Sequence, residues 1–534
     1  MHETCGNGRG RNGTRPTGRR TGRGTRAVRL AAWSALVVAA PAVLLPAVAP
    51  HAVAQQQPLT PDDQAALLLN AGRRAYNDRN YAQAAERFRE FVQKFPAHAD
   101  APAAQYGLGL SLIDGPRDYP AAAEAFGKAA ASASSPDRPL ALFFQGTALR
   151  SVGHAATAAA RGKPQGEADQ QRAVARQRYE ESAAKFAEAA AALAEKLKAA
   201  PAEDKAELAE WAARARCDQA EMLIRVGKHK EAVDAAHLVT DDQGFAKSKY
   251  RKLALYHVGH ARYALKEYLS AGKVLTQLAP FDQEYGPHAR YLLARVQHQL
   301  NDPQKAAEEY RAVIAGYDAA KKAAALQLQQ GGNALPADRK SHLEAVATGP
   351  APEYVPRAAF YLATLLGDEG KFPEAKELFA KFAAENTDSP LAPEAQARVG
   401  YCQLQAKQFK EAVDTLTPLK DHVRLGEQAT WWLAKAQLSL ADPANADATK
   451  AAGAAAVPLL RSAADRTQAA IGQGDAAAKA RRAEILMDLA DALAQAGQFR
   501  DSANAYQQVA AEYATSERGE EAMQRYCTAL HLAG

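Results

Sequence analysis

A pattern of small and aromatic residues recurs along this 534-residue chain at a constant spacing. A small residue is followed nine positions later by an aromatic or similar residue, and further small, aromatic and apolar residues follow at steps of three, four and three. The first copy is Gly72, Tyr81, Ala84, Phe88 and Phe91. Self-similarity at a fixed period is typical of arrays in which one supersecondary unit is stacked many times. The sequence therefore predicts a repeat array.

Six further copies keep this spacing, and another fits with one inserted residue. The further copies are Ala220, His229, Ala232, Ala236 and Val239; Gly259, Tyr268, Ala271, Leu275 and Leu278; Ala294, Pro303, Ala306, Tyr310 and Val313; Ala363, Phe372, Ala375, Phe379 and Phe382; Gly400, Phe409, Ala412, Leu416 and Leu419; Ala490, Phe499, Ser502, Tyr506 and Val509; and, with the insertion, Gly109, Tyr119, Ala122, Phe126 and Ala129. Two more units are split by polar or alanine-rich stretches, and they contain Tyr179, Ser182, Phe186 and Ala189, and Trp431, Trp432, Leu460 and Ala463.

The spacing has a physical meaning if each copy is a helical hairpin. Steps of three and four place residues on one helix face, so the second half of each copy forms an apolar seam. The small residue allows the second helix to approach closely, and a short polar turn such as Gly227-Lys228 reverses the chain. We expect Ala84, Ala271 and Ala375 at the helix contacts. One hairpin cannot bury its own apolar face, so hairpins must stack.

The composition agrees with an all-α protein. Apolar residues make up 47% of the chain but aromatic residues only 7%, and alanine dominates. Ala, Leu, Glu, Gln, Lys and Arg have the highest helix propensities. The chain is also longer than a single hydrophobic core normally becomes, so it requires several domains or an array.

These repeats resemble the tetratricopeptide-repeat (TPR) family, whose unit is about 34 residues long. The resemblance implies a TPR-type helical-hairpin solenoid, a right-handed superhelix whose concave face binds other proteins. It covers residues 62–532, about nine to ten hairpins with insertions near 154–169, 318–352 and 442–455. The last helix, Glu520 to Leu532, has no partner hairpin and is expected to cap the stack.

Two motifs are similar to repeats of bacterial envelope members of this family. The first runs Phe88-x-x-Phe91-x-x-x-Phe95-Pro96 and then Ala101-Pro102-x-x-Gln105-Tyr106-x-Leu108-Gly109, and the second is Ser389-Pro390-x-Ala392-Pro393-Glu394-Ala395-x-Ala397. They resemble the cell-division coordinator of the Tol–Pal system and the TPR lipoprotein of the outer-membrane β-barrel assembly machine. The chain lacks the acylated cysteine of the lipoprotein and the coiled coil of the coordinator. The resemblance therefore implies an envelope location and a binding role, not the identity of either protein.

Residues 1–54 have the layout of a basic prefix and a secretory signal peptide, and residues 55–61 form a short linker. An apolar run from Leu30 to Val48 follows Arg29, and Ala52-Val53-Ala54 fits signal peptidase. We expect cleavage after Ala54 and a periplasmic protein. The alternative is an uncleaved anchor in the inner membrane, since about 20 apolar residues can span a bilayer. The prefix also leaves open whether translation starts at Met1 or Val28.

The net charge of +6 comes from this leader, which holds eight arginines against one acidic residue. The rest of the chain is nearly neutral and has no basic footprint for nucleic acid, so nucleic-acid binding is not expected. No HExxH, Walker, GxSxG or paired CxxC motif occurs, so we expect no enzyme activity, cofactor or small-molecule substrate. His257 and His260 lack further ligands for a metal site. Cys217, Cys402 and Cys527 are expected to be buried apolar residues.

The candidate partner-binding residues lie in the first helices of three successive hairpins, at steps of three and four around the small residue. Tyr and Arg anchor protein interfaces most often, because they combine apolar area with directional polar contacts. The predicted groove residues are Tyr256, His260, Tyr263, His288, Tyr291, Arg295, His298, Arg357 and Phe360. Partner segments with acidic groups would suit Arg295 and Arg357. The corresponding residues of the last hairpin are Glu484, Met487, Asp491 and Ala494.

Three functions remain open at this stage. The first is an envelope scaffold that binds a segment of another envelope or periplasmic protein. The second is an outer-membrane assembly or export factor. The third is a solenoid partner of a peptidoglycan enzyme, because soluble lytic transglycosylases carry an exported helical superhelix beside a lysozyme-like catalytic domain. No such domain is expected here, since the repeats cover residues 62–532. Membrane association is expected only if the leader is not cleaved.

Overall fold

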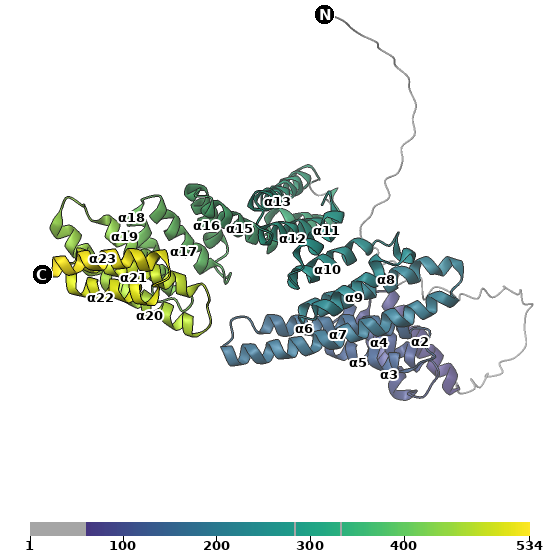
Figure 1. The fold of residues 1–534 in the computed structure, drawn as a ribbon. Coiled ribbons are helices and arrows are strands. Elements are labelled where there is room, and N and C mark those ends of the chain that lie inside the picture. Colours follow the sequence, from purple (N-terminus) through teal and green to yellow (C-terminus); the bar gives the residue numbers. More distant parts are fainter. Residues whose placement is uncertain (1–59, 282–284, 332–333) are drawn as a thin grey trace, which may run out of the picture. The chain divides into compact units, whose positions relative to one another are not determined.

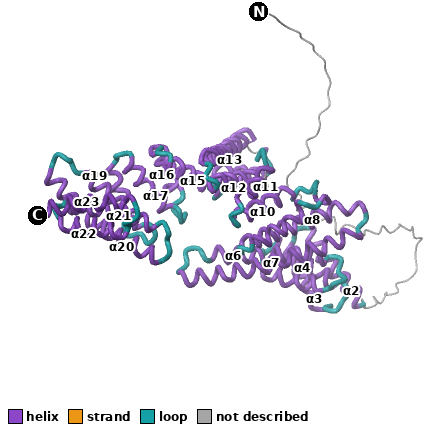
Figure 2. Tube along the Cα trace, viewed as in Figure 1, coloured by secondary structure: helices purple, strands orange, loops and turns teal. Residues whose placement is uncertain are grey.

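The computed structural model describes residues 60–281, 285–331 and 334–534. The expected leader and its cleavage site lie outside the described residues. The described residues form α-helices and short 3₁₀ helices joined by loops, without a strand (Figure 1, Figure 2). None of the described helices has both the length and the apolar character of a bilayer span. The all-α prediction is therefore confirmed for this part of the chain.

The chain divides into two compact units at Ala254, within helix α10 (Arg251–Ala264). Unit 1 holds consecutive helices that pack against their neighbours in the chain. Its elements are α2 (Pro61–Asn77), α3 (Tyr81–Lys94), α4 (Ala101–Asp114), α5 (Tyr119–Ala131), α6 (Arg138–Ala159), α7 (Gln165–Ala199), α8 (Ala202–Arg225), α9 (His229–Thr240) and η1 (Gln243–Phe245).

Unit 2 contains residues 255–534 and continues the same order of paired helices. Its elements after α10 are α11 (Tyr268–Leu275), η2 (Thr276–Leu278), α12 (Gly286–Gln299), α13 (Pro303–Gly331), α14 (Ala337–Thr348), α15 (Tyr354–Asp368), α16 (Phe372–Glu385), α17 (Ala392–Gln405), α18 (Phe409–Leu416), η4 (Thr417–Leu419), α19 (Gly426–Leu440), α20 (Ala446–Gly472), α21 (Ala478–Gln495), α22 (Phe499–Glu512) and α23 (Glu517–Ala533).

The small residue of each repeat lies against the second helix of the same hairpin, as predicted. A Cβ atom added to Gly72 would come within 2.7 Å of the Phe88 ring, and one added to Gly400 would come within 2.5 Å of Leu416. Both distances are shorter than real Cβ contacts allow. Ala84, Ala271 and Ala375 are fully buried at 0% exposure. The repeat thus encodes the close approach of two helices, which any larger side chain would block.

A residue in the left-handed conformation ends the first helix of many hairpins, two positions before the aromatic residue of the repeat. Gly227 and Gly497 have φ of 81° and 77° there, whereas Arg79, Lys266 and Lys407 adopt φ of 60–64° with a side chain. A left-handed residue after a helix directs the chain back along it, and glycine adopts this conformation most easily.

The three expected insertions are mostly helical. In unit 1, α6 and α7 extend to the connection at residues 160–164. The two helices are in close contact, with Gly153 of α6 against the Tyr179 ring of α7. In unit 2, α13 is 29 residues long and α14 packs against it through Leu343 and Ala347. The alanine-rich stretch after residue 445 forms the first turns of α20. The first and third segments lengthen helices, and the second also adds α14 between α13 and α15.

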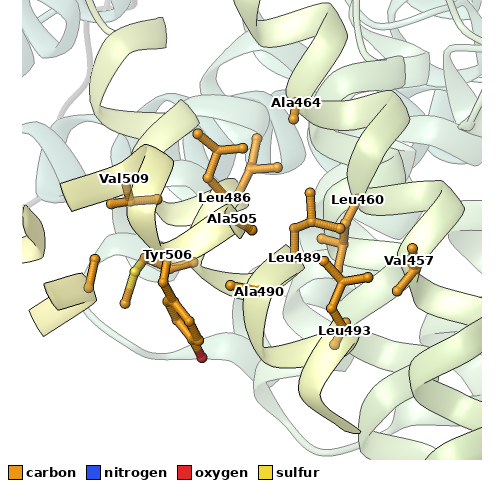
Figure 3. Close-up of a cluster of buried hydrophobic side chains, with 14 of the residues drawn as sticks. Val457, Leu460, Ala464, Leu486, Leu489, Ala490, Leu493, Ala505, Tyr506 and Val509 are labelled. Atoms are coloured by element: carbon orange, nitrogen blue, oxygen red, sulfur yellow. The ribbon is translucent and has the colours of Figure 1, made fainter. Parts of the chain in front are cut away.

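The core around α20, α21 and α22 shows how neighbouring hairpins pack together. In Figure 3, Leu489 and Leu493 lie beside Leu460 and Val457, while Leu486 lies toward Tyr506 and Val509. Helix α21 therefore contributes to the seams on both sides of it. Cys217 and Cys402 are buried as predicted, but the prediction was wrong for Cys527, which is exposed on α23.

Candidate protein-binding surface

The nine predicted groove residues all lie in unit 2, on α10, α12 and α15. These are the first helices of successive hairpins, and α12 contacts α15 although α13 and α14 separate them in sequence. Tyr263, Tyr291, Arg295 and His298 are partly exposed. Tyr361 is partly exposed too, although the sequence rule did not select it. Together with the buried Tyr310 they form what we call the aromatic cluster. Rings from three helix pairs therefore meet on one surface.

Arg295 lies at the centre of the aromatic cluster. Its Nε donates a hydrogen bond of 3.1 Å to the Tyr263 hydroxyl. Its guanidinium carbon lies 3.6 Å from the centroid of the Tyr361 ring, which is within the range of a cation–π interaction. A hydroxyl at one edge and a ring on one face thus fix the orientation of the guanidinium.

The rings behind Arg295 form a continuous set of contacts. Tyr310 stacks on Tyr361 with centroids 6.1 Å apart, and Tyr291 lies 6.4 Å from Tyr310. His298 is 6.3 Å from both Tyr310 and Tyr361, and its Nδ1 is 3.5 Å from the Tyr310 hydroxyl. Tyr310 comes from the seam of α13, so the cluster is built directly on the hairpin core.

A second group of rings continues the cluster toward the N-terminal ends of α12 and α15. The His288 ring lies 4.2 Å from Tyr354, and Tyr354 lies 6.5 Å from Tyr291. Tyr256 contacts His288 at 6.1 Å and stacks on Tyr285 at 6.4 Å. His260 lies 5.9 Å from Tyr256 on the same helix. The structure therefore brings together seven of the nine predicted residues in one series of contacts.

Two predicted residues have other environments. Phe360 was expected to be exposed, and this expectation is wrong: it is only 3% exposed and packs 5.4 Å from both Phe379 and Phe382 in the seam with α16. The next residue, Tyr361, is about 100° further round the helix and faces Arg295 instead. Arg357 is exposed as expected, but it forms an ion pair of 2.5 Å with Glu353 on its own helix.

Sequence reasoning missed four members of this surface: Tyr285, Tyr310, Tyr354 and Tyr361. Tyr285 and Tyr354 lie one further turn before His288 and Arg357, so the same three-residue step would have found them. Tyr310 belongs to the repeat string and was assigned to the seam alone. Tyr361 had no signal in the sequence, because the choice between it and Phe360 depends on how α15 is rotated.

Burial sets the charge state of the cluster. It raises the pKa of Tyr291 to about 12 and raises the pKa of Tyr310 further above the ordinary value. Burial also lowers the pKa of His288 and of His298, and Arg295 lowers the latter further. Near pH 7 the tyrosines and these histidines are therefore uncharged. Burial opposes the charge of Arg295, but the tyrosine hydroxyls around it outweigh this effect and raise its pKa.

The described residues contain no group of three or more His, Cys, Asp or Glu side chains that could hold a metal ion. His257 is buried in α10, whereas His260 is partly exposed, so the two histidines do not share one surface. The arrangement offers stacking surfaces, hydroxyls and one cation. It is suited to binding a peptide segment.

Comparison with known proteins identifies the repeat. The tetratricopeptide-repeat family model matches residues 69–139 and 361–417. Yeast Tom70 aligns with 13% identity over 88% of this chain and 96% of its own, with a TM-score of 0.29. The apo form of RapI aligns with 12% identity over 72% of this chain and 97% of its own, with a TM-score of 0.40. No curated protein matches the sequence.

Proposed function

From two segments that match the tetratricopeptide repeat and an all-α fold of TPR type, we propose that this chain is a non-enzymatic scaffold that binds a segment of another protein. Proteins with TPR repeats generally mediate protein–protein interaction. The proposed site is the aromatic cluster of unit 2, and the proposed location is the bacterial cell envelope.

The observation that carries this proposal is the aromatic cluster itself. Tyr263, Tyr291 and Tyr361 are partly exposed around a single fixed arginine, although rings of this size are normally buried in a seam or scattered singly over a surface. Tyrosine and arginine lose little conformational freedom when neighbours already hold them, so a partner that contacts them is bound at a small entropic cost. The cluster therefore has the composition and the preorganisation of an interface centre.

The test compares partner capture by the wild-type protein with capture by a double variant. Tyr291→Ala with Arg295→Ala removes one ring and the cation from the cluster. Tyr513→Ala with Arg500→Ala, on or next to α22, removes the same two residue types elsewhere and serves as the control. Proximity labelling of envelope proteins in the native host, read by quantitative mass spectrometry, measures capture, and thermal unfolding measures stability.

We expect the cluster variant to lose specific partners although its unfolding temperature does not change. The control variant should capture the same partners as the wild type. Capture that is unchanged, or lost only together with the fold, would contradict the proposal. The identity of the captured proteins separates the envelope functions. Tol–Pal or peptidoglycan proteins would favour a scaffold or an enzyme partner, and β-barrel or export components would favour an assembly factor.

The envelope location is supported by the leader and by the resemblance of two motifs to envelope TPR proteins. If the leader is removed, the mature protein begins at Gln55 and is recovered in the periplasmic fraction. N-terminal sequencing of the fractionated protein tests this directly. Recovery only in membranes with the leader intact would favour an anchored protein instead.

A further inference from the structure

Arg295 is a partly buried cation without a carboxylate partner in the described part of the chain, and this sets it apart from similar arginines of unit 2. Arg290 pairs with Glu309 at 2.7 Å, Arg398 with Glu394 at 3.2 Å, and Arg481 with Glu427 at 2.8 Å. Within the described residues, the guanidinium of Arg295 makes a hydrogen bond to the Tyr263 hydroxyl and a cation–π contact with the Tyr361 ring. Its charge is therefore not compensated by an acidic residue of this structure.

The groups around Arg295 cannot supply the missing negative charge. The tyrosines beside it stay protonated near neutral pH because burial raises their pKa, and His298 is uncharged rather than anionic. Proteins seldom remove a guanidinium from water without an opposite charge, because the lost hydration is not recovered by neutral contacts alone. An uncompensated cation at the centre of a binding surface therefore indicates where an anionic group of a ligand belongs.

The contacts of Arg295 leave the two Nη groups of its guanidinium as donors for a ligand. Nε is occupied by the Tyr263 hydroxyl and one face is covered by Tyr361, so the two Nη groups remain as donors. Arg295 is partly exposed, and within the described residues its guanidinium makes a hydrogen bond through Nε and none through either Nη atom. Two parallel N–H donors in one plane match the two oxygens of a carboxylate.

We propose that Arg295, held by Tyr263 and Tyr361, binds a carboxylate of the partner segment, so that the recognised segments are acidic peptides. This inference rests on the proposed function. Arg357 does not share this role, because Glu353 already neutralises it. Of the two cations that the sequence offered for acidic groups, the structure favours one. Apolar or aromatic side chains next to the carboxylate would contact Tyr291 and Tyr354.

The test uses an array of immobilised random decapeptides. Each peptide with an Asp or Glu has a twin in which Asn or Gln replaces it, and each free C-terminus has an amidated twin. The full-length mature protein is applied as wild type, Arg295→Gln, Arg295→Lys and the matched control Arg357→Gln. Thermal unfolding of each variant is measured alongside. The amide twins distinguish a side-chain carboxylate from a C-terminal one.

We expect the wild type to prefer acidic peptides over their amide twins by about tenfold or more, the effect of one hydrogen-bonded charge pair. Arg295→Gln should abolish the preference, Arg295→Lys should keep part of it, and Arg357→Gln should leave it unchanged. Equal binding of acidic and amide twins that still depends on Tyr291 would overturn this inference but leave the proposed function intact. Absence of any peptide binding would overturn both. The twin comparison on the wild type requires no variant to fold.

Discussion

The aromatic cluster and the last hairpin present different chemistry at equivalent positions of the repeat. Where α10 and α12 carry His260 and Arg295, one position after the small residue, α21 carries Asp491. Asp491 accepts hydrogen bonds from Arg525 of α23 at 2.7 Å and from the Tyr506 hydroxyl. Glu484 lies before Asp491 on the same helix, and it pairs with Arg518 of α23 at 2.6 Å. The acidic positions of the last hairpin are thus neutralised by the chain itself.

The two regions differ in whether the charges of the first helix are paired within the chain. Helix α23 supplies two arginines to the acidic positions of α21, and Met487 between them is only 4% exposed. At the cluster the described residues supply tyrosines to a cation and no anion. Helix α23 pairs with the charges of the helix that it covers, whereas the cluster keeps a charge for which the described residues offer no counterpart.

The largest expected effect comes from removing the tyrosine at the same seam position in each region. Tyr310 is 0% exposed and Tyr506 is 4% exposed, so Tyr310→Ala and Tyr506→Ala should each cost about 3–5 kcal/mol of local stability through the cavity left behind. Hydrogen exchange resolved by peptide measures both. We expect the loss of protection to stay near the altered hairpin, because repeat arrays contact mainly their neighbours. Uniform loosening of unit 2 would contradict an array with separable regions.

A smaller effect is expected from overfilling a seam below the aromatic cluster. Ala271 is fully buried in the core that α11 shares with α12, so Ala271→Leu should cost about 1–3 kcal/mol by overpacking. Exchange should increase in α10 to α12 while α21 to α23 keep their protection. Equal stability of the variant and the wild type would show that the helices are not in close contact there. The exposed Ala264→Leu is the control and should change stability little.

The hydroxyls of Tyr506 and Tyr310 should contribute differently to stability. Tyr506→Phe removes a hydrogen bond to the carboxylate of Asp491 and should cost about 1.5 kcal/mol. Tyr310→Phe removes only a long contact of 3.5 Å to His298 and should change stability little. Hydrogen exchange measured at increasing denaturant concentration gives the local free energy of unfolding of each variant. A larger loss of stability in Tyr310→Phe than in Tyr506→Phe would contradict the assignment of the stronger hydrogen bond to Tyr506.

The smallest expected effect is a difference in pH dependence. Burial lowers the pKa of His288 and His298, so their contribution to folding is complete above the unfolded value of about 6.5 and is lost as the pH falls through the folded value. Hydrogen bonds from Arg518 lower the pKa of Glu521, whose contribution is lost only below about 4.3. Between pH 7 and pH 5, α12 should therefore lose protection while α23 does not. Parallel loss in both helices would contradict this assignment.

The sequence predicted the hairpin architecture well because the repeat spacing is a local property. Gly72 and Gly400 appear in the sequence only as small residues at a fixed distance from Phe88 and Leu416, yet that spacing follows directly from two helices in contact. The candidate surface was predicted in part. Stepping by three and four from the small residue selected all four members on α12, and each of them contacts a ring of the surface. The same step failed at Phe360, which the packing of α15 on α16 turns inward.

The sequence by itself determined that helices pair and which face of each pair is buried, since both depend on the periodicity of one short segment. Only the tertiary structure decided which charges are compensated. Arg295 and Arg357 look alike in the sequence, but one is enclosed by Tyr263 and Tyr361 and the other is neutralised by Glu353. The reason is that an ion pair or a ring contact depends on distances of a few ångströms between side chains. The side chains that enclose Arg295 come from the hairpins on either side of its own, so a short stretch of sequence does not show them.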